Sequence, residues 1–303
     1  MAVVTDSTAY LPPDVVRRAG VTVVPLQVIL DGRSLPEGEG TSAAAVAGAL
    51  RAGQTVTTSR PAPALFAATY RQLAEAGFDA VVSVHLSSDV SGTVDAARVA
   101  SREVAPQIPV RVVDARSVGM GLGFAVLAAV RAAGSPEVVG GVASPGDAAE
   151  GVAEVTTRAA LATRVWFYVD TLEYLRRGGR LTAARAWLGT ALAVKPLLHL
   201  VDGRIELLER VRTASRALGR LQEIVVGEVG ESRVDVVVHH LDAAERAQAL
   251  AAALGEALPG CREVTVSEIG AVVGAHVGPG LLAVVTSPVA GGAGPDGLLG
   301  PSA

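Results

Sequence analysis

The sequence has one cysteine, Cys261, one lysine, Lys195, and an aromatic content of only 3% over its 303 residues. A single cysteine excludes a disulfide framework and a cysteine-rich zinc site, and it is typical of a reducing compartment. The lysine is followed by Pro196, so the chain lacks the Gly-x-x-x-x-Gly-Lys-Ser/Thr loop with which P-loop proteins cradle phosphate. Schiff-base chemistry would have to depend on Lys195 alone.

The sequence also lacks a basic surplus and a long hydrophobic run. Its 26 basic residues face 30 acidic ones, which argues against electrostatic binding of nucleic acid. The most apolar windows, Gly121–Val130 and Leu188–Val194, fall short of the ~20 residues that a membrane span requires. The N-terminus lacks the basic flank of a signal peptide, and no His-Glu-x-x-His or similar spacing indicates a metal site. We therefore expect a cytoplasmic protein with no cofactor, no metal and no nucleic-acid partner.

Hydrophobic residues make up 50% of the chain, which excludes disorder and favours a packed α/β core. In the first half, short apolar runs alternate with stretches of helical period, as expected for a mainly parallel sheet covered on both faces. Strands are expected at 2–5, 21–30, 79–85 and 109–114, with helices at 13–19, 42–52, 63–76, 93–104, 121–133 and 147–163.

From Arg164 onward the pattern changes to a mixture of hairpin and helices. Asp202-Gly203 predicts a type I′ hairpin between strands at 194–201 and 204–208. Helices are expected at 171–177, 213–229 and 243–258, and strands at 165–169, 234–239, 263–269 and 281–286. The fold class is thus α/β with two domains, a three-layer α/β/α domain over 1–163 and a smaller α+β domain with a mixed sheet over 164–288. The Gly/Pro/Ala-rich end predicts a flexible tail over 289–303.

Polar residues cluster in four loops that follow predicted strands, the place where open α/β sheets bind ligands. Two of them, around Thr58 and Ser91, lead into helices, where hydroxyls and free backbone N–H groups suit an anion. Taken singly, Ser59, Ser91 and Thr93 are interpreted as ordinary helix caps. Two such loops in one sheet, with a Gly-flanked histidine to join them, fit an anion site equally well. The four loops are Asp6-Ser7-Thr8, Thr57–Pro61, His85–Thr93 and Gly270–Gly280.

His276 stands between glycines in the last of these loops, where we expect unusual backbone angles or close approach to another group. The remaining histidines lie on or beside predicted strands and are interpreted as structural. Arg180 follows Gly178-Gly179 and fits either a helix end or a site for phosphate or an acidic partner. Arg212 belongs to a group of arginines interpreted as a solvated helix face.

Five segments resemble the DegV family, in family order, over roughly residues 2–286. Each would be weak alone, but the five together with fitting spacing are specific. They are Val3-Val4-Thr5-Asp6-Ser7-Thr8, Thr58-Ser59-Arg60-Pro61, Leu86-Ser87-Ser88-Asp89-Val90-Ser91-Gly92-Thr93, the stretch from Val169 to Arg180, and His276-Val277-Gly278-Pro279-Gly280.

The resemblance implies a two-domain fatty-acid-binding protein, the FakB-type component of bacterial fatty acid kinase systems. Such a protein holds a fatty acid in a tunnel between its domains, and a separate kinase subunit related to dihydroxyacetone kinases phosphorylates the carboxylate with ATP. The acyl phosphate then enters phospholipid synthesis, which permits transient membrane contact. By the match, Thr58, Ser59, Ser91, Gly92 and His276 bind the carboxylate, while Arg180 and Arg212 serve phosphotransfer or kinase docking.

Once a phosphoryl group is added, the resemblance leads us to expect that a protonated His276 helps to balance its charge. Two positions depart from the family pattern: Arg60 replaces a glutamine and Val94 replaces a tyrosine. Acyl chain length and saturation, the identity of the kinase and the oligomeric state stay open. The alternative is a serine hydrolase acting on an acyl substrate, with Ser91 as nucleophile, His276 as base and Asp6 or Asp89 orienting it. No Gly-x-Ser-x-Gly elbow surrounds Ser91.

Overall fold

The computed structural model describes residues 1–181 and 194–289. Their contacts divide the chain into two compact units. Unit 1 contains residues 1–25 and 60–162, and unit 2 contains residues 26–59 together with the described part of 163–289. The expected flexible tail lies outside the described residues except for residue 289.

Unit 1 is built on a four-stranded, wholly parallel sheet with the strand order β2-β1-β6-β7. Every residue of β1 and β6 is buried, as expected for central strands covered on both faces. The strands are β1 (Ala2–Asp6), β2 (Thr22–Val24), β6 (Val81–His85) and β7 (Val110–Asp114).

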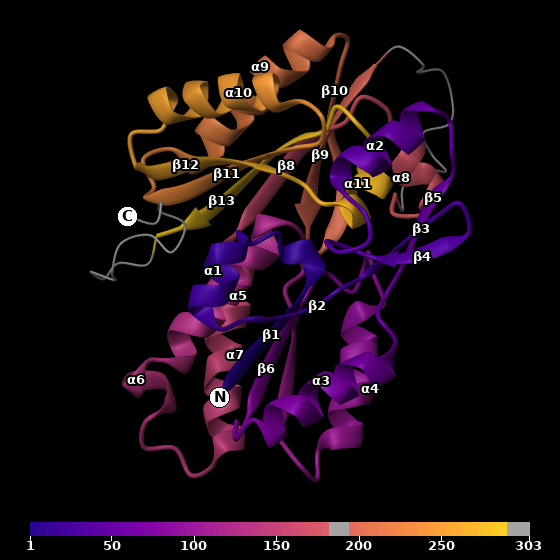
Figure 1. Ribbon diagram of the computed structural model, residues 1–303. Coiled ribbons are helices and arrows are strands. Elements are labelled where there is room, and N and C mark those ends of the chain that lie inside the picture. The colour runs from indigo at the N-terminus through magenta and orange to yellow at the C-terminus, as the bar shows by residue number, and fades with distance from the viewer. Residues whose placement is uncertain (182–193, 290–303) are drawn as a thin grey trace. The chain divides into compact units, whose positions relative to one another are not determined.

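Helices cover both faces of this sheet (Figure 1), so the three-layer arrangement is confirmed for unit 1. Phe66 and Tyr70 of α3 and Ala100 of α4 pack with Val4 and Val81 in one core layer, while α5 and α7 pack against the other side. The helices are α1 (Pro13–Ala19), α3 (Pro63–Glu75), α4 (Thr93–Val104), α5 (Met120–Ala133), α6 (Pro136–Val139) and α7 (Pro145–Ala162), with a 3-10 turn η1 (Ser7–Ala9) after β1.

Unit 2 contains a six-stranded mixed sheet with the order β10-β9-β8-β13-β11-β12. Only the β11–β12 pair is parallel. Asp202 and Gly203 both have positive φ, so the predicted hairpin turn between β9 and β10 is confirmed. The strands are β8 (Arg164–Tyr168), β9 (Lys195–Val201), β10 (Arg204–Val211), β11 (Val234–His240), β12 (Cys261–Glu268) and β13 (Leu282–Pro288).

Two long helices, α9 (Ala214–Val229) and α10 (Ala244–Ala257), lie side by side on one face of this sheet (Figure 1). Leu221 and Val225 of α9 and Leu254 of α10 form a core with Trp166 and Val236 of the strands. Apolar burial at this spacing is what positions an amphipathic helix on a sheet.

The structure corrects the expected continuous first domain. Residues 26–59 belong to unit 2, where they form a three-stranded antiparallel sheet, β4-β3-β5, and helix α2 (Ala43–Arg51). The apolar run from Val21 to Leu30 was expected to be one strand, but Pro25 has no N–H to donate to a ladder, and the run is split between two sheets. The strands of the small sheet are β3 (Gln27–Leu30), β4 (Arg33–Pro36) and β5 (Val56–Ser59).

Two short helices accompany the small sheet, α8 (Glu173–Arg177) and α11 (Ala271–Val277). The second corrects another expectation, because residues 270–280 were interpreted as a loop. Gly270 is instead the N-cap of α11, and Gly278, with φ of 75°, is its C-cap. The buried carboxylate of Glu37 accepts the Val272 N–H at 2.7 Å and so caps this helix from the strand side.

Candidate functional site

Thr58 and His276 meet in unit 2 although 218 residues separate them in the sequence. Thr58 lies on β5, paired with Val28 of β3, and His276 lies in the last turn of α11, which packs against β5. Their side chains are hydrogen-bonded, with 2.8 Å between Thr58 Oγ1 and His276 Nε2. Thr58 was expected in a loop before a helix; the structure places its hydroxyl on a strand instead.

The imidazole of His276 is mostly buried and closely packed. Its Nδ1 atom is buried and has no hydrogen-bond partner among the described residues. It lies directly against Gly178, where a Cβ atom would collide with it. Burial, together with the positive charge of Arg180, lowers the pKa of His276 to about 4. The neutral form of His276 is therefore favoured near neutral pH, and its protonation beside an added phosphoryl group stays a prediction.

A pocket of about 180 Å³ opens beside this pair, entirely within unit 2. Arg180 lines it, with its guanidinium donating to the carbonyl of Gly178 and its pKa lowered by burial. Arg177, also in the lining, is paired with Glu173. The full lining comprises Leu50, Gln54, Thr55, Val56, Thr57, Thr58, Tyr174, Arg177, Gly178, Arg180, Ala275 and His276.

Gly278 follows α11 and lies against the ring of Tyr174, which also lines the pocket. Its φ of 75° is in the left-handed region, and an added Cβ would collide with the ring. Tyr174 was not among the expected site residues. The Gly278-Pro279-Gly280 sequence indicates unusual backbone angles but not which side chain packs against it. A glycine is required at position 278 by both backbone angle and packing.

Two predicted residues of unit 2 lie outside this pocket. Ser59 ends β5, opposite Gln27, and is exposed. Its interpretation as a helix cap is wrong, because the N-cap of α3 is Ala62. Arg212 is exposed between β10 and α9, whose N-cap is Thr213. The structure thus brings together Thr58, His276 and Arg180, and leaves Arg212 on the surface.

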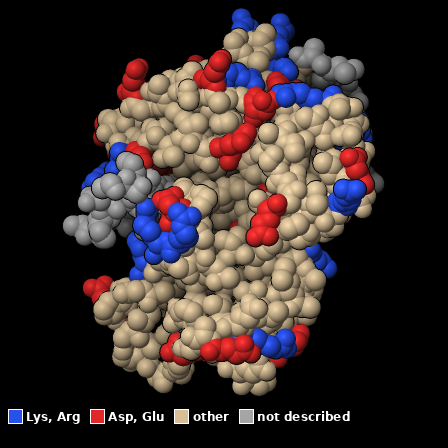
Figure 2. Space-filling model, in the orientation of Figure 1, with Lys and Arg blue, Asp and Glu red and all other residues tan. Residues whose placement is uncertain are grey.

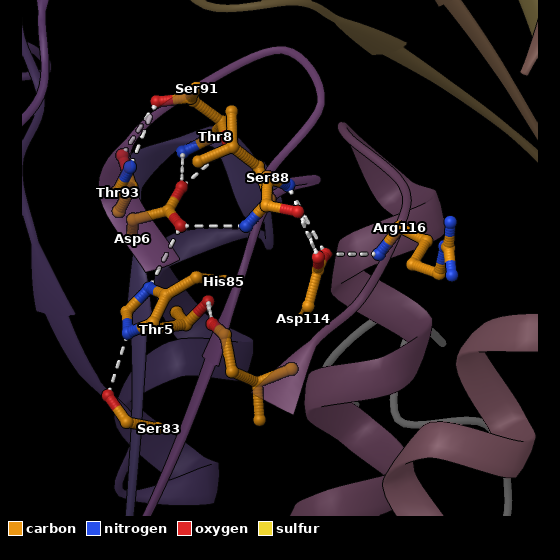
Figure 3. Close-up of polar contacts among 12 residues, drawn as sticks. Thr5, Asp6, Thr8, Ser83, His85, Ser88, Ser91, Thr93, Asp114 and Arg116 are labelled. Atoms are coloured by element: carbon orange, nitrogen blue, oxygen red, sulfur yellow. Dashed lines mark hydrogen bonds and ion pairs between the residues drawn. The ribbon is translucent and has the colours of Figure 1, made fainter. Parts of the chain in front are cut away.

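Ser91 and Gly92 lie in unit 1, in the loop between β6 and α4. Ser91 Oγ lies 2.8 Å from Thr93 Oγ1 and accepts the N–H of Thr93, the first residue of α4, at 3.3 Å (Figure 3). Gly92 is the N-cap residue, and the side chain of Arg60 lies directly against its Cα. The hydroxyl at this helix N-terminus is as predicted, but the neighbouring cation was not foreseen.

Sequence analysis did not predict the pairing of Asp6 with His85 in unit 1. The carboxylate of Asp6 is fully buried and hydrogen-bonded to His85, which was interpreted only as structural (Figure 3). The available signal was positional, since Asp6 and Asp114 end the two strands that flank β6. Parallel strands present their carboxyl ends at one edge, so both side chains can reach the loop after β6.

The single lysine, Lys195, is hydrogen-bonded to Asp170. Lys195 Nζ donates to the backbone oxygen of Asp170 at 3.0 Å and to its Oδ1 at 3.3 Å. The hydroxyl of Tyr168 donates to the same Oδ1 at 2.5 Å, and burial raises the pKa of Tyr168. Lys195 therefore helps to fix the segment after β8 that leads to α8.

The visible surface is mostly uncharged, and acidic and basic side chains stand beside one another on it (Figure 2). Arg220 contacts Glu209 and Glu223, and Arg262 contacts Asp235. Across residues 1–181 and 194–289, no group of three or more acidic, histidine or cysteine side chains is placed to hold a metal ion. Within the same residues, no helix has the length and apolar character needed to span a membrane.

Comparison with known proteins places this architecture in a family. A family model described as "Uncharacterised protein, DegV family" matches residues 1–289. A DegV domain-containing protein of Streptomyces coelicolor is 54% identical over 95% of this chain and 98% of its own length. A DegV domain-containing protein of Mycobacterium tuberculosis is 39% identical over 94% of this chain and 96% of its own.

Solved structures agree. A DegV family protein from Thermus thermophilus, described as binding fatty acid, superposes with a TM-score of 0.84 at 33% identity, covering 95% of this chain and 99% of that one. DegV from Bacillus subtilis, described as a fatty acid binding protein, gives a TM-score of 0.83 at 30% identity with the same coverage. The chain belongs to the DegV family.

Proposed function

We propose that this chain is a fatty-acid carrier that presents the carboxylate of its ligand to a separate ATP-dependent kinase, yielding an acyl phosphate for phospholipid synthesis. The observation that carries the proposal is the Thr58–His276 pair at a pocket also lined by Arg180. Relatives at 30% and 33% identity are described as fatty-acid-binding proteins. Thr58, Ser59 and His276 from unit 2 and Ser91 and Gly92 from unit 1 are the proposed carboxylate ligands.

The energetics of carrying a lipid are reasonable. Burying an acyl chain of ~14 methylenes at ~0.8 kcal/mol each gains roughly 11 kcal/mol. Association costs of about 4–15 kcal/mol offset much of that gain, which leaves binding that can be reversed. A carboxylate without partners in an apolar site would cost many kcal/mol, so hydroxyl donors must replace its water.

The neutral state of His276 determines what Thr58 can do. We assign the imidazole proton to Nε2, because a proton on the partnerless Nδ1 would be a buried unsatisfied donor. Nε2–H then donates to Thr58 Oγ1, which frees the threonine proton to donate to the ligand. Such uncharged donors stabilise the carboxylate without a tight ion pair, so its oxygen stays nucleophilic.

In the proposed reaction a carboxylate oxygen attacks the terminal phosphorus of ATP held by the kinase. The bond between that phosphorus and the bridging oxygen breaks, and ADP leaves with the electron pair. Arg180 lies close enough to His276 to lower its pKa, and it would compensate the added negative charge. Arg212, exposed on the surface, is a proposed kinase contact.

The direct test is denaturing solvent extraction of the purified protein followed by lipid mass spectrometry. The expected result is a long-chain fatty acid in stoichiometric amount, and native mass spectrometry should show one added fatty acid per delipidated chain. An empty protein that also refuses added fatty acid would refute the carrier function.

The serine-hydrolase hypothesis gains no support from the geometry. Ser91 is hydrogen-bonded to Thr93, His276 Nε2 to Thr58, and Asp6 to His85. The carrier proposal predicts no turnover of a short acyl ester, and measurable esterase activity that Ser91→Ala abolishes would reverse this preference.

A further inference from the structure

The loop that carries Ser91, residues 86–92, is held by carboxylates from both neighbouring strands (Figure 3). It follows β6, which lies between β1 and β7 in the sheet. Asp6 is the last residue of β1 and Asp114 the last of β7. The two carboxylates differ sharply, since Asp6 is fully buried and Asp114 makes its contacts nearer the surface.

Asp6 receives four donors, two on each oxygen. Oδ1 accepts the backbone N–H of Thr8 at 3.0 Å and its hydroxyl at 2.6 Å. Oδ2 accepts the backbone N–H of Leu86 at 3.0 Å and contacts His85 Nδ1 at 3.0 Å. A proton on Asp6 would point at one of these donors, so the geometry fits a carboxylate that accepts from all four.

The histidine is oriented in turn by a buried chain of hydroxyls. His85 Nε2 lies 2.7 Å from Ser83 Oγ, which also accepts the hydroxyl of Tyr70 at 2.8 Å. Ser83 Oγ, which accepts from Tyr70, can donate to Nε2 of a neutral imidazole or accept from a protonated one. With a carboxylate at Asp6, Nδ1 carries a proton in both cases and donates to Asp6.

The anchored Leu86 lies directly before the turn that presents Ser91. The next residue, Ser87, accepts the backbone N–H of Ser91 at 3.1 Å through its carbonyl and that of Asp89 at 3.2 Å through its hydroxyl. Asp114 supports the outer side, where its carboxylate accepts the hydroxyl of Ser88 at 2.5 Å and the N–H of Arg116 at 2.8 Å. Asp6 therefore holds Leu86, and the adjacent Ser87 holds Ser91, so that only a short stretch of backbone connects the Asp6 carboxylate to Ser91.

We infer that Asp6 is a positioning residue for the carboxylate site, acting through the Leu86 N–H on the hydroxyl of Ser91. The inference rests on the proposed function, because Ser91 is a proposed ligand of the fatty-acid carboxylate. Thr8 and Leu86 hold Asp6 directly, the Ser83–Tyr70 chain contacts only the far side of the His85 ring, and Asp114 has a lesser role at the surface.

Asp6→Asn is the decisive variant, since its amide group cannot accept on both sides as the carboxylate does. If the amide NH₂ faces Leu86 and His85, the backbone anchor of the loop is lost. If it faces Thr8, the turn after β1 is lost instead. We expect faster hydrogen exchange in the peptide 86–92 and a fatty-acid affinity about tenfold or more lower, as for loss of a charged hydrogen bond that orders a ligand group.

Two matched variants separate positioning from general destabilisation. Ser83→Ala strips partners from Tyr70 and His85 in the same buried network but keeps the bonds from Asp6 to Leu86 and Thr8. Asp114→Asn keeps an oxygen for Arg116 and an NH₂ that can donate to the Ser88 hydroxyl. Both should bind fatty acid within about threefold of wild type, at a temperature where circular dichroism shows every variant folded.

The outcomes are distinct. Equal affinity in Asp6→Asn and Ser83→Ala, or unchanged exchange of the loop in Asp6→Asn, would overturn the inference. A wild-type protein that binds no fatty acid in the same titration would overturn the proposed function itself. If Asp6→Asn does not fold, Thr8→Val removes the 2.6 Å donor that orients the Asp6 carboxylate. Weaker fatty-acid binding together with faster exchange of 86–92 then supports the inference, and wild-type values of both overturn it.

Discussion

The two groups of predicted carboxylate ligands are positioned by different physical means. In unit 1, the loop around Ser91 is held by hydrogen bonds to two carboxylates, one of them fully buried with four donors. In unit 2, the His276 ring packs directly against Gly178 and is hydrogen-bonded to Thr58 through Nε2, while its buried Nδ1 has no partner among the described residues. Hydrogen bonds fix direction, whereas contact with a glycine leaves no space for a side chain at that position.

This difference predicts which kind of mutation each of the two regions tolerates least. A packed site should fail when volume is added, while a hydrogen-bonded site should fail when an acceptor is removed. Burial and the charge of Arg180 lower the pKa of His276, whose Nδ1 has no hydrogen-bond partner among the described residues, and so favour its neutral form. The following predictions test this contrast, beginning with the largest expected effect.

Gly278→Ala should have the largest effect among the changes considered for the pocket of unit 2. It adds left-handed backbone strain of about 1 kcal/mol and a collision with the Tyr174 ring of about 1–3 kcal/mol. Thermal unfolding and fatty-acid binding should both weaken. Gly179→Ala is the matched control, because its φ is also positive, at 70°, but no atom lies within 4 Å of the added carbon. Equal effects of the two variants would show that packing at Gly278 is unimportant.

Thr58→Ala and Ser91→Ala should each lower fatty-acid affinity and acyl phosphate formation by about tenfold or more, since each removes a donor to a charged group. Thr58→Ala should cost more, because it also removes the hydrogen-bond partner of His276. Thr58→Ser, which keeps the hydroxyl, is the control and should retain most binding. Titration of delipidated protein with fatty acid measures the affinity, and a reconstituted kinase assay measures acyl phosphate formation. Unchanged turnover in both alanine variants would remove these residues from the site.

His276 should make the protein less stable as the pH falls. Its folded-state pKa of about 4 lies below the ordinary value of 6.5, so the unfolded chain binds the proton first and stability drops between those two values. The contribution is at most about 1.4 kcal/mol per pH unit. Urea unfolding from pH 7 to pH 4 should show a shallower decline in His276→Gln. His239, whose burial also lowers its pKa to about 4, should add a separate increment. An unchanged slope in His276→Gln would contradict the prediction.

Arg60→Gln should have the smallest effect and test the cation that lies directly against Gly92. Arg60 is exposed, so its attraction for a carboxylate is screened by salt. We expect affinity to fall about two- to threefold at low ionic strength and to match wild type at about 1 M salt. A deficit that persists at high salt would indicate a direct contact with the ligand instead.

Much of unit 1 could be predicted because its signals are local. Pro13 and Gly20 bound α1, and the strand that ends at His85 is followed by a helix that begins at Thr93, as expected from caps and hydrophobic period. The Asp202-Gly203 hairpin was equally accessible, since few sequences besides Asp-Gly tolerate two positive φ angles.

The remainder depended on contacts between distant residues. Helix α11 has only seven residues, two of its positions are Gly274 and His276, and it is stabilised by Glu37 and by packing against α2. No local period could reveal that. Thr58 was found for its hydroxyl but assigned to the wrong local structure, because the partners of β5 lie in a hairpin that begins only after Pro25.

The path of the chain through the units has a consequence for biosynthesis. Residues 26–59 emerge from the ribosome early, yet Glu37 meets Val272 only after another 235 residues have been added. At about 5–20 residues per second that wait is roughly 10 to 50 seconds. Unit 1 can complete its sheet meanwhile, since its last described helix ends at Ala162. The segment that carries Thr58 can pair its own strands but must therefore wait for α11 during most of translation, when Val28 and its neighbours are most open to capture by chaperones.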